Sequence, residues 1–281
     1  MSSPSDPDQQ PAEPPPMTVM AAVGWSFGVT FGLILLRSLT LSVRPGSTND
    51  LVAQIACQAI SYLLGLFLIL RVHSPDASIR DTIGLRPTHV AFYPLAILLG
   101  VAIEIPADGL YDLIVRRFPT GIEDHFVEMY RDSSTPRRAL FGLLIIAVGP
   151  ALEEMLFRGA LFRLLAKANP IDTVIGVTAM LFAVAHLEWQ MFLPIGIVGL
   201  ALAFMRNASG SIVPSLLLHG SFNAMSFALM ARSKPGATES TAFPPNIVAA
   251  AAGVALLLLG VAHLVGRRSL VATSARELDR R

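Results

Sequence analysis

The apolar segment 139–165 is long enough to cross a lipid bilayer, yet it contains charged residues. About 20 apolar residues in a helix span the roughly 30 Å of hydrocarbon in a membrane. Inside this segment lie Glu153, Glu154 and Arg158. A charged side chain at that depth costs at least about 2.5 to 3.5 kcal/mol, so such residues usually face a protein interior and serve a function. We therefore expect this helix to carry the functional site.

The composition is that of a multi-pass membrane protein. Of the 281 residues, 53% are hydrophobic and only 15% are charged, against about 25% charged in soluble proteins. The net charge of +1, without a basic stripe, gives no support to nucleic-acid binding. The single cysteine, Cys57, excludes an intramolecular disulfide, and we interpret it as a packing residue.

Eight apolar segments predict an all-α fold, a polytopic membrane bundle of about eight transmembrane helices. They lie at about 18–43, 51–70, 88–106, 139–165, 171–187, 189–205, 209–231 and 246–266. An even number of spans places both termini on one side of the membrane. The excess of Lys and Arg on that side favours cytoplasmic termini. We expect an integral protein of a bacterial inner membrane, since the acidic, proline-rich start of the chain is typical of bacterial proteins of this kind.

The chain divides into a tail, a membrane domain and a second tail. Residues 1–16 are rich in proline and acid and predict a disordered N-terminal tail. Residues 17–266 hold all the apolar segments, with the polar motifs of interest between 139 and 231. Residues 267–281 predict a basic C-terminal tail.

Charged residues interrupt the apolar pattern between 107 and 137. This pattern predicts an amphipathic interfacial segment or a loop with short helices. One alternative is a metal site, which would use Glu123, Asp124, His125 and Glu128. We favour a solvated charged face, because that is the usual state of charges at this density.

The two adjacent glutamates of segment 139–165 have different roles by geometry. Neighbouring residues of a helix point about 100° apart, so Glu153 and Glu154 face different surroundings. Glu154 and Arg158 are four residues apart and are expected to pair on one face. Glu153 is then left without a charged partner, and an unpaired carboxylate in an apolar site suits a general base.

Two later segments also carry polar side chains at membrane depth. His186 follows Phe182 by one turn, and Asn223 follows His219 by one turn. Each of these residues alone is as consistent with interhelical hydrogen bonding. A free carboxylate, two histidines and an amide on three helices can together activate water and stabilise an oxyanion. We therefore predict a functional site that contains Glu153, His186, His219 and Asn223.

These motifs resemble the CPBP family of intramembrane proteases. That family includes CAAX prenyl endopeptidases, bacterial relatives grouped with bacteriocin-processing, immunity and abortive-infection (Abi) proteins, and a myxosortase-like branch. Its pattern of Glu-Glu-x-x-x-Arg, then Phe-x-x-x-His, then His-x-x-x-Asn occurs here in the same order, beginning at Glu153, Phe182 and His219. The resemblance covers about residues 139–231 and implies that the membrane domain 17–266 is a protease domain.

The resemblance implies a role for each motif residue. Glu153 would activate the attacking water, and His186 would hold the same water. His219 and Asn223 would polarise the scissile carbonyl and stabilise the oxyanion, a contribution typically worth a few kcal/mol. The remaining motif residues, which would support the site, are Glu154, Arg158 and Phe182.

Two mechanisms remain open on the sequence. A zinc ion, Zn2+, bound by Glu153, His186 and His219 would make the protein a metalloendopeptidase. A glutamate with a histidine can also activate water unaided, and Asn223 is a poor zinc ligand. We favour the glutamic mechanism without a metal or other cofactor.

The resemblance also implies a class of substrate. The expected reaction is hydrolysis of a peptide bond near a membrane-embedded or lipid-anchored segment, as in CAAX-type processing or removal of a C-terminal sorting tail. The partners would be the lipid bilayer and a membrane-anchored protein or peptide. A proton-coupled transporter also carries intramembrane Glu and His, but we see no internal repeat. A non-catalytic peptide-binding immunity protein is the third possibility, and the intact motif set argues against it.

Overall fold

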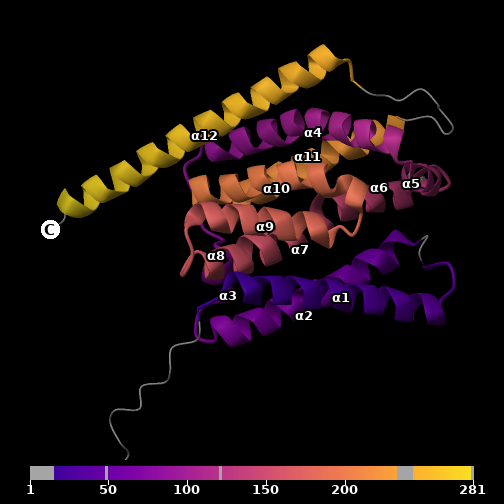
Figure 1. Cartoon of the computed structure of the whole chain (residues 1–281), viewed down its shortest axis with the longest axis horizontal. Coiled ribbons are helices and arrows are strands. Elements are labelled where there is room, and N and C mark those ends of the chain that lie inside the picture. Colours follow the sequence, from indigo (N-terminus) through magenta and orange to yellow (C-terminus); the bar gives the residue numbers. More distant parts are fainter. Residues whose placement is uncertain (1–15, 48–49, 120–121, 233–242, 280–281) are drawn as a thin grey trace, which may run out of the picture.

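The computed structural model describes residues 16–47, 50–119, 122–232 and 243–279, with the backbone alone for 122–126 and 269–279. Throughout these ranges the regular structure is helical, which confirms the all-α prediction. The helices lie side by side in a bundle (Figure 1). On one flank are α1 (Val19–Val43) and α2 (Leu51–His73), and on the opposite flank is α12 (Pro245–Asp279). The predicted disordered tail lies, except for Pro16, outside the described residues.

Six helices among the described residues are long and apolar enough to cross a membrane. They are α1, α2, the composite helix Thr135–Leu165, α10 (Trp189–Ser209), α11 (Ile212–Arg232) and Pro245–Arg268 of α12. The other two predicted segments are also helical. One is α9 (Ile171–Ala185), which is short, and the other is α4 (Phe92–Arg117), which carries several charges. The protein is therefore a multi-pass helical membrane protein, as predicted.

Several helices end later than the hydropathy pattern predicts. Helix α4 continues through Pro106 to Arg117, beyond the expected end near residue 106. Its last turns carry charged side chains, and Arg116 Nε lies 2.8 Å from Asp112 Oδ2 in an exposed ion pair. Helix α12 likewise continues to Asp279, into the residues expected to form a basic tail. Charge interrupts the apolar pattern in both cases without interrupting the helix, because Lys, Arg and acidic residues are compatible with helical backbone.

A short helix follows α4 in the region where short helices were expected. Helix α5 (Ile122–Arg131) precedes the composite helix. Arg138, at the start of that helix, donates from Nε to the carbonyl of Tyr130 at 3.1 Å. The side chains of Glu123, Asp124 and His125, named above as an alternative metal site, lie outside the described residues.

The composite helix Thr135–Leu165 lies at the centre of the bundle. It comprises α6 (Thr135–Leu143), α7 (Gly149–Glu154) and α8 (Phe162–Leu165), separated by the π-helical turns Leu144–Val148 and Met155–Leu161. Every residue from Leu156 to Phe162 is buried. A helix buried on all sides is usually apolar on all sides, so the few charges it carries must be balanced within the helix or by neighbouring helices.

Candidate active site

A fully buried ion pair joins Glu154 and Arg158. Arg158 Nη1 donates to Glu154 Oε1 at 3.0 Å, and neither side chain has any exposed area. This confirms the pairing predicted from their spacing. Helix α10 holds the arginine from two directions: Nη2 donates to the carbonyl of Gly199 at 3.0 Å, and Arg206 Nε donates to the Arg158 carbonyl at 3.0 Å.

The ion pair is not fully satisfied. Among the described residues, Glu154 Oε2 and Arg158 Nε are buried without a hydrogen-bond partner. Each such atom costs free energy, and in native proteins such atoms call for an explanation such as a catalytic role.

His219 of α11 links the two glutamates. Its Nδ1 lies 3.0 Å from Glu154 Oε1, and its Nε2 lies 3.6 Å from Glu153 Oε2. A carboxylate only accepts hydrogen bonds, so Nδ1 carries a hydrogen while Glu154 is ionised. The other ring nitrogen, Nε2, therefore faces Glu153. The contact between His219 and Glu154 could not be predicted from the spacing of these residues.

Glu153 has a different environment from its neighbour. Its side chain is 15% exposed, against 0% for Glu154, and its Oε1 accepts a hydrogen bond of 2.8 Å from Gln58 Nε2 of α2. With neutral histidines, two carboxylates and one guanidinium leave one negative charge in the cluster, which a proton on Nε2 of His219 would balance. That charge belongs to Glu153, because Arg158 neutralises Glu154.

Gln58 is a site residue that sequence reasoning missed. Its side chain bonds between helices, and its acceptor is Glu153. The available signal was a polar side chain in the middle of an apolar span. Nothing in the spacing of residues could indicate its partner, which lies 95 positions further along the chain.

His186 lies at the end of α9. Its Nδ1 lies 2.8 Å from the carbonyl of Phe182, and since a carbonyl only accepts, Nδ1 carries the hydrogen. In the neutral ring Nε2 is then an acceptor. The next residue, Leu187, has a left-handed backbone (φ 62°), which costs a residue with a Cβ about 1 to 2 kcal/mol. Helix α9 therefore ends just before His186, and the turn that follows it is strained at Leu187.

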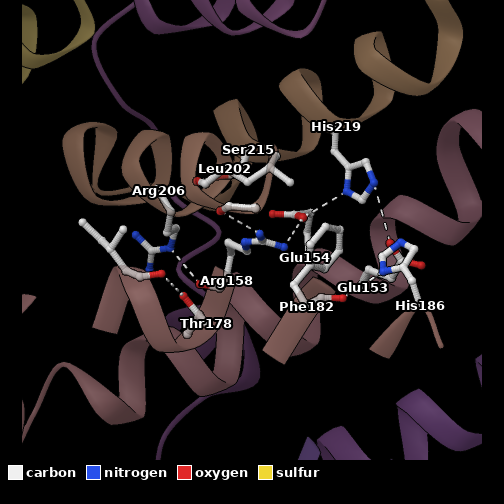
Figure 2. Close-up of polar contacts among 12 residues, drawn as sticks. Glu153, Glu154, Arg158, Thr178, Phe182, His186, Leu202, Arg206, Ser215 and His219 are labelled. Carbon is white, nitrogen blue, oxygen red and sulfur yellow. Dashed lines mark hydrogen bonds and ion pairs between the residues drawn. The ribbon is translucent and has the colours of Figure 1, made fainter. Parts of the chain in front are cut away.

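Phe182 lies at the centre of the cluster. Its ring meets the rings of both histidines edge to face, with centroid distances of 4.8 Å to His186 and 5.5 Å to His219. The Arg158 guanidinium carbon lies 4.2 Å from the centroid of the same ring. Figure 2 shows Glu153, His186 and His219 at one end of the cluster and Arg206 at the other. Phe182 thereby fixes the relative positions of three polar side chains.

Truncation of Phe182 should destabilise the protein and impair its activity together. The side chain is 1% exposed, and removing a buried phenylalanine side chain costs about 3 to 5 kcal/mol. We expect Phe182→Ala to lower the midpoint of thermal unfolding in detergent. Phe192→Ala removes the same ring from a position that is 43% exposed and should change the midpoint much less. Equal midpoints for the two variants would contradict the central role of Phe182.

Asn223 bonds to the first π-helical turn. Its Nδ2 donates to the carbonyl of Ile145 at 2.8 Å. In a helix the Ile145 carbonyl would accept from the residue four or five positions later, Gly149 or Pro150. The Gly149 N–H donates to the Leu144 carbonyl instead, and Pro150 has no N–H, so neither can bond to Ile145. A Cβ on Gly220 would lie 3.1 Å from the carbonyl of Ile146, which shows how closely α11 approaches this turn. One N–H of the Asn223 amide is used here, and the amide has a second.

No metal centre is formed by the residues that the structure describes. Across the described ranges, no group of three or more His, Cys, Asp or Glu side chains has a geometry that could hold a metal ion. This includes the set Glu153, His186 and His219, named above as the zinc alternative. We therefore derive no chemical step through a metal.

These observations define the class of the site. Side chains from α2, α7, α9 and α11 meet inside a membrane bundle, where they combine one uncompensated carboxylate with two histidines. Carboxylate and imidazole groups are the usual general bases and acids of enzymes. The arrangement is suited to acid–base chemistry inside the membrane bundle.

Comparison with known proteins is consistent with an acid–base site inside a membrane bundle. Residues 135–225 match the family described as type II CAAX prenyl endopeptidase Rce1-like. The match agrees with the family resemblance of the motifs, because it covers all three of them. An uncharacterized 24.3 kDa protein of Escherichia coli is 26% identical over 214 residues, which cover 72% of this chain and 89% of that protein. No solved structure gives a significant match.

Proposed function

We propose that this protein is an intramembrane endopeptidase in which Glu153 is the general base. The observation that carries the proposal is the asymmetry of the two glutamates. Arg158 neutralises Glu154, whereas Glu153 keeps its charge beside His219 and is the more exposed of the two. A base needs a proton-accepting oxygen that substrate and water can reach.

The proposed reaction uses the site residues in turn. A water molecule gives one proton to Glu153 Oε2 and attacks the scissile carbonyl carbon, while its remaining O–H donates a hydrogen bond to Nε2 of His186. His219, when both its ring nitrogens carry hydrogen, donates from Nε2 to the resulting oxyanion. The second N–H of Asn223 is the further donor. Collapse of the oxyanion breaks the carbon–nitrogen bond, and the proton held by Glu153 passes to the leaving amine.

The proposed substrate is a protein or peptide with a lipid anchor or a membrane-embedded tail. Support comes from the location of the site between apolar helices and from the CAAX-type family match over residues 135–225. Removal of residues that follow a lipidated cysteine and removal of a C-terminal sorting tail both fit this description. We place the protein in a bacterial inner membrane.

A comparison of protein C-termini tests this function. Cells that express the wild type or Glu153→Gln at equal levels are compared for the C-terminal peptides of membrane and secreted proteins. We expect a defined set of tails to remain uncut only in the variant, which also identifies the cleavage site. Identical C-termini in the two strains, with both proteins present in the membrane, would contradict the proposal and favour binding or transport.

We expect the proposed reaction to be insensitive to chelators. The described side chains do not form a metal-binding group, and Glu153 with His186 can activate water directly. Purified protein treated with 1,10-phenanthroline should keep its cleavage rate within about twofold, a change of at most 0.4 kcal/mol in activation free energy. Loss of cleavage that Zn2+ restores would overturn the metal-free mechanism and leave the proteolytic function in place.

A further inference from the structure

The hydrogen bond between Gln58 and Glu153 gives the two carboxylate oxygens of the proposed base different surroundings. Oε1 accepts from Gln58 Nε2 at 2.8 Å, whereas Oε2 faces His219 Nε2 at 3.6 Å. The orientation of the amide is fixed by chemistry, since a carboxylate only accepts and the amide nitrogen must therefore face it. The oxygen left available for water is thus Oε2, on the histidine side.

Gln58 is held rigidly enough to position its partner. Its side chain is buried, with 7% exposed. One turn further along α2, Tyr62 is buried and packs edge to face on Phe157 of the composite helix, with a centroid distance of 6.3 Å. The residue before Tyr62, Ser61, donates from Oγ to the carbonyl of Val29 in α1 at 2.7 Å. Helix α2 is thereby fixed to both neighbours by contacts that do not involve Glu153.

We propose that Gln58 is a positioning residue that holds the Glu153 carboxylate so that Oε2 points toward His219. The inference rests on the proposed function of Glu153. Gln58 lies outside the segment 135–225 that matches the protease family, so the first third of the chain contributes to the site as well as to the membrane scaffold. Without this hydrogen bond the carboxylate is free to rotate about its side-chain torsions, and the fraction of molecules with a correctly placed base falls.

Gln58→Met is the direct test, because methionine is unbranched and of similar length but has no N–H donor. We expect kcat for the identified peptide substrate to fall about 10- to 100-fold, since small misplacements of a reacting group cost up to about 10²-fold. KM should stay within about twofold, because Gln58 does not contact substrate. Gln58→Glu should reduce kcat further, because it places a second carboxylate against Glu153. Gln58→Asn keeps the amide on a shorter side chain and should recover part of the lost kcat.

Ser61→Ala is the matched control on the same helix. It removes a hydrogen bond to α1 without a contact to Glu153 and leaves the packing of Tyr62 on Phe157 in place, so we expect its kcat to fall much less than that of Gln58→Met. If Gln58→Met has the kcat of Ser61→Ala, or changes KM alone, the positioning role is wrong. If the wild type cleaves and Glu153→Gln does not, the proposed function survives that result. If the wild type cleaves no peptide, the proposed function fails and this inference fails with it.

Discussion

Glu153→Gln should abolish cleavage and leave the protein folded, whereas Glu154→Gln should weaken both activity and stability. At position 153 the new amide still offers an oxygen to Gln58, so the contact between α2 and the composite helix is kept. Only the proton-accepting carboxylate is lost, and a general base typically contributes about 10²- to 10⁴-fold in rate. At position 154 the exchange removes the charge that balances Arg158 in a fully buried pair.

Two measurements on the same purified proteins separate these outcomes. Thermal unfolding in detergent reports stability, and cleavage of the identified peptide reports activity. Each variant is the control for the other, since both make the same chemical change at adjacent positions. Cleavage by Glu153→Gln at the wild-type rate would rule out the proposed base. Normal stability of Glu154→Gln would show that the buried ion pair is not needed for folding.

Arg158→Met should cause a large loss of stability, comparable to that of Phe182→Ala. The exchange leaves Glu154 buried without a counter-charge and removes the donor to Gly199 and the cation from the Phe182 ring. Breaking a buried ion pair by removing one partner costs about 3 to 5 kcal/mol. The expected result is a lower midpoint of denaturant unfolding in mixed micelles. Little folded protein should be recovered at elevated temperature.

A double variant separates two effects on stability, that of an unpaired buried charge and that of the lost packing of Arg158. Glu154→Met combined with Arg158→Met leaves no charge unpaired, so we expect it to be more stable than Arg158→Met alone. It should remain inactive, because His219 Nδ1 has lost its acceptor. Arg116→Met is the control for loss of a surface ion pair, with the arginine side chain 60% exposed, and should cost about 1 kcal/mol or less. A double variant less stable than Arg158→Met would contradict this explanation.

The parts of the site that follow from local helix geometry could be predicted from the sequence. Glu154 and Arg158 are four residues apart on one helix, and the structure pairs them at 3.0 Å. The same geometry separated the roles of the two adjacent glutamates. The order and type of the helices followed from hydropathy, although charges near residues 106 and 266 made two of them look shorter than they are.

The contacts between helices could not be predicted, because no spacing rule relates residues of different helices. His219 reaches Glu154 across 65 positions, and Gln58 reaches Glu153 across 95. The bond from Asn223 to Ile145 depends on a π-helical turn, whose only sequence signal is Pro150 within an apolar helix. The oxyanion role of Asn223 stays a prediction.

The ion pair within one helix bears on how the protein is made. During synthesis the segment with Glu154 and Arg158 enters the membrane before α9 and α11 exist. Because these two charges neutralise each other within a single helix, the segment can insert at a lower cost than two isolated charges. Glu153, in contrast, has no histidine beside it until His219 is synthesised, 66 residues later in the chain. A truncated or stalled chain that ends before α11 would therefore hold a neutral pair and an inert glutamate, and the proposed activity would appear only when α11 is in place.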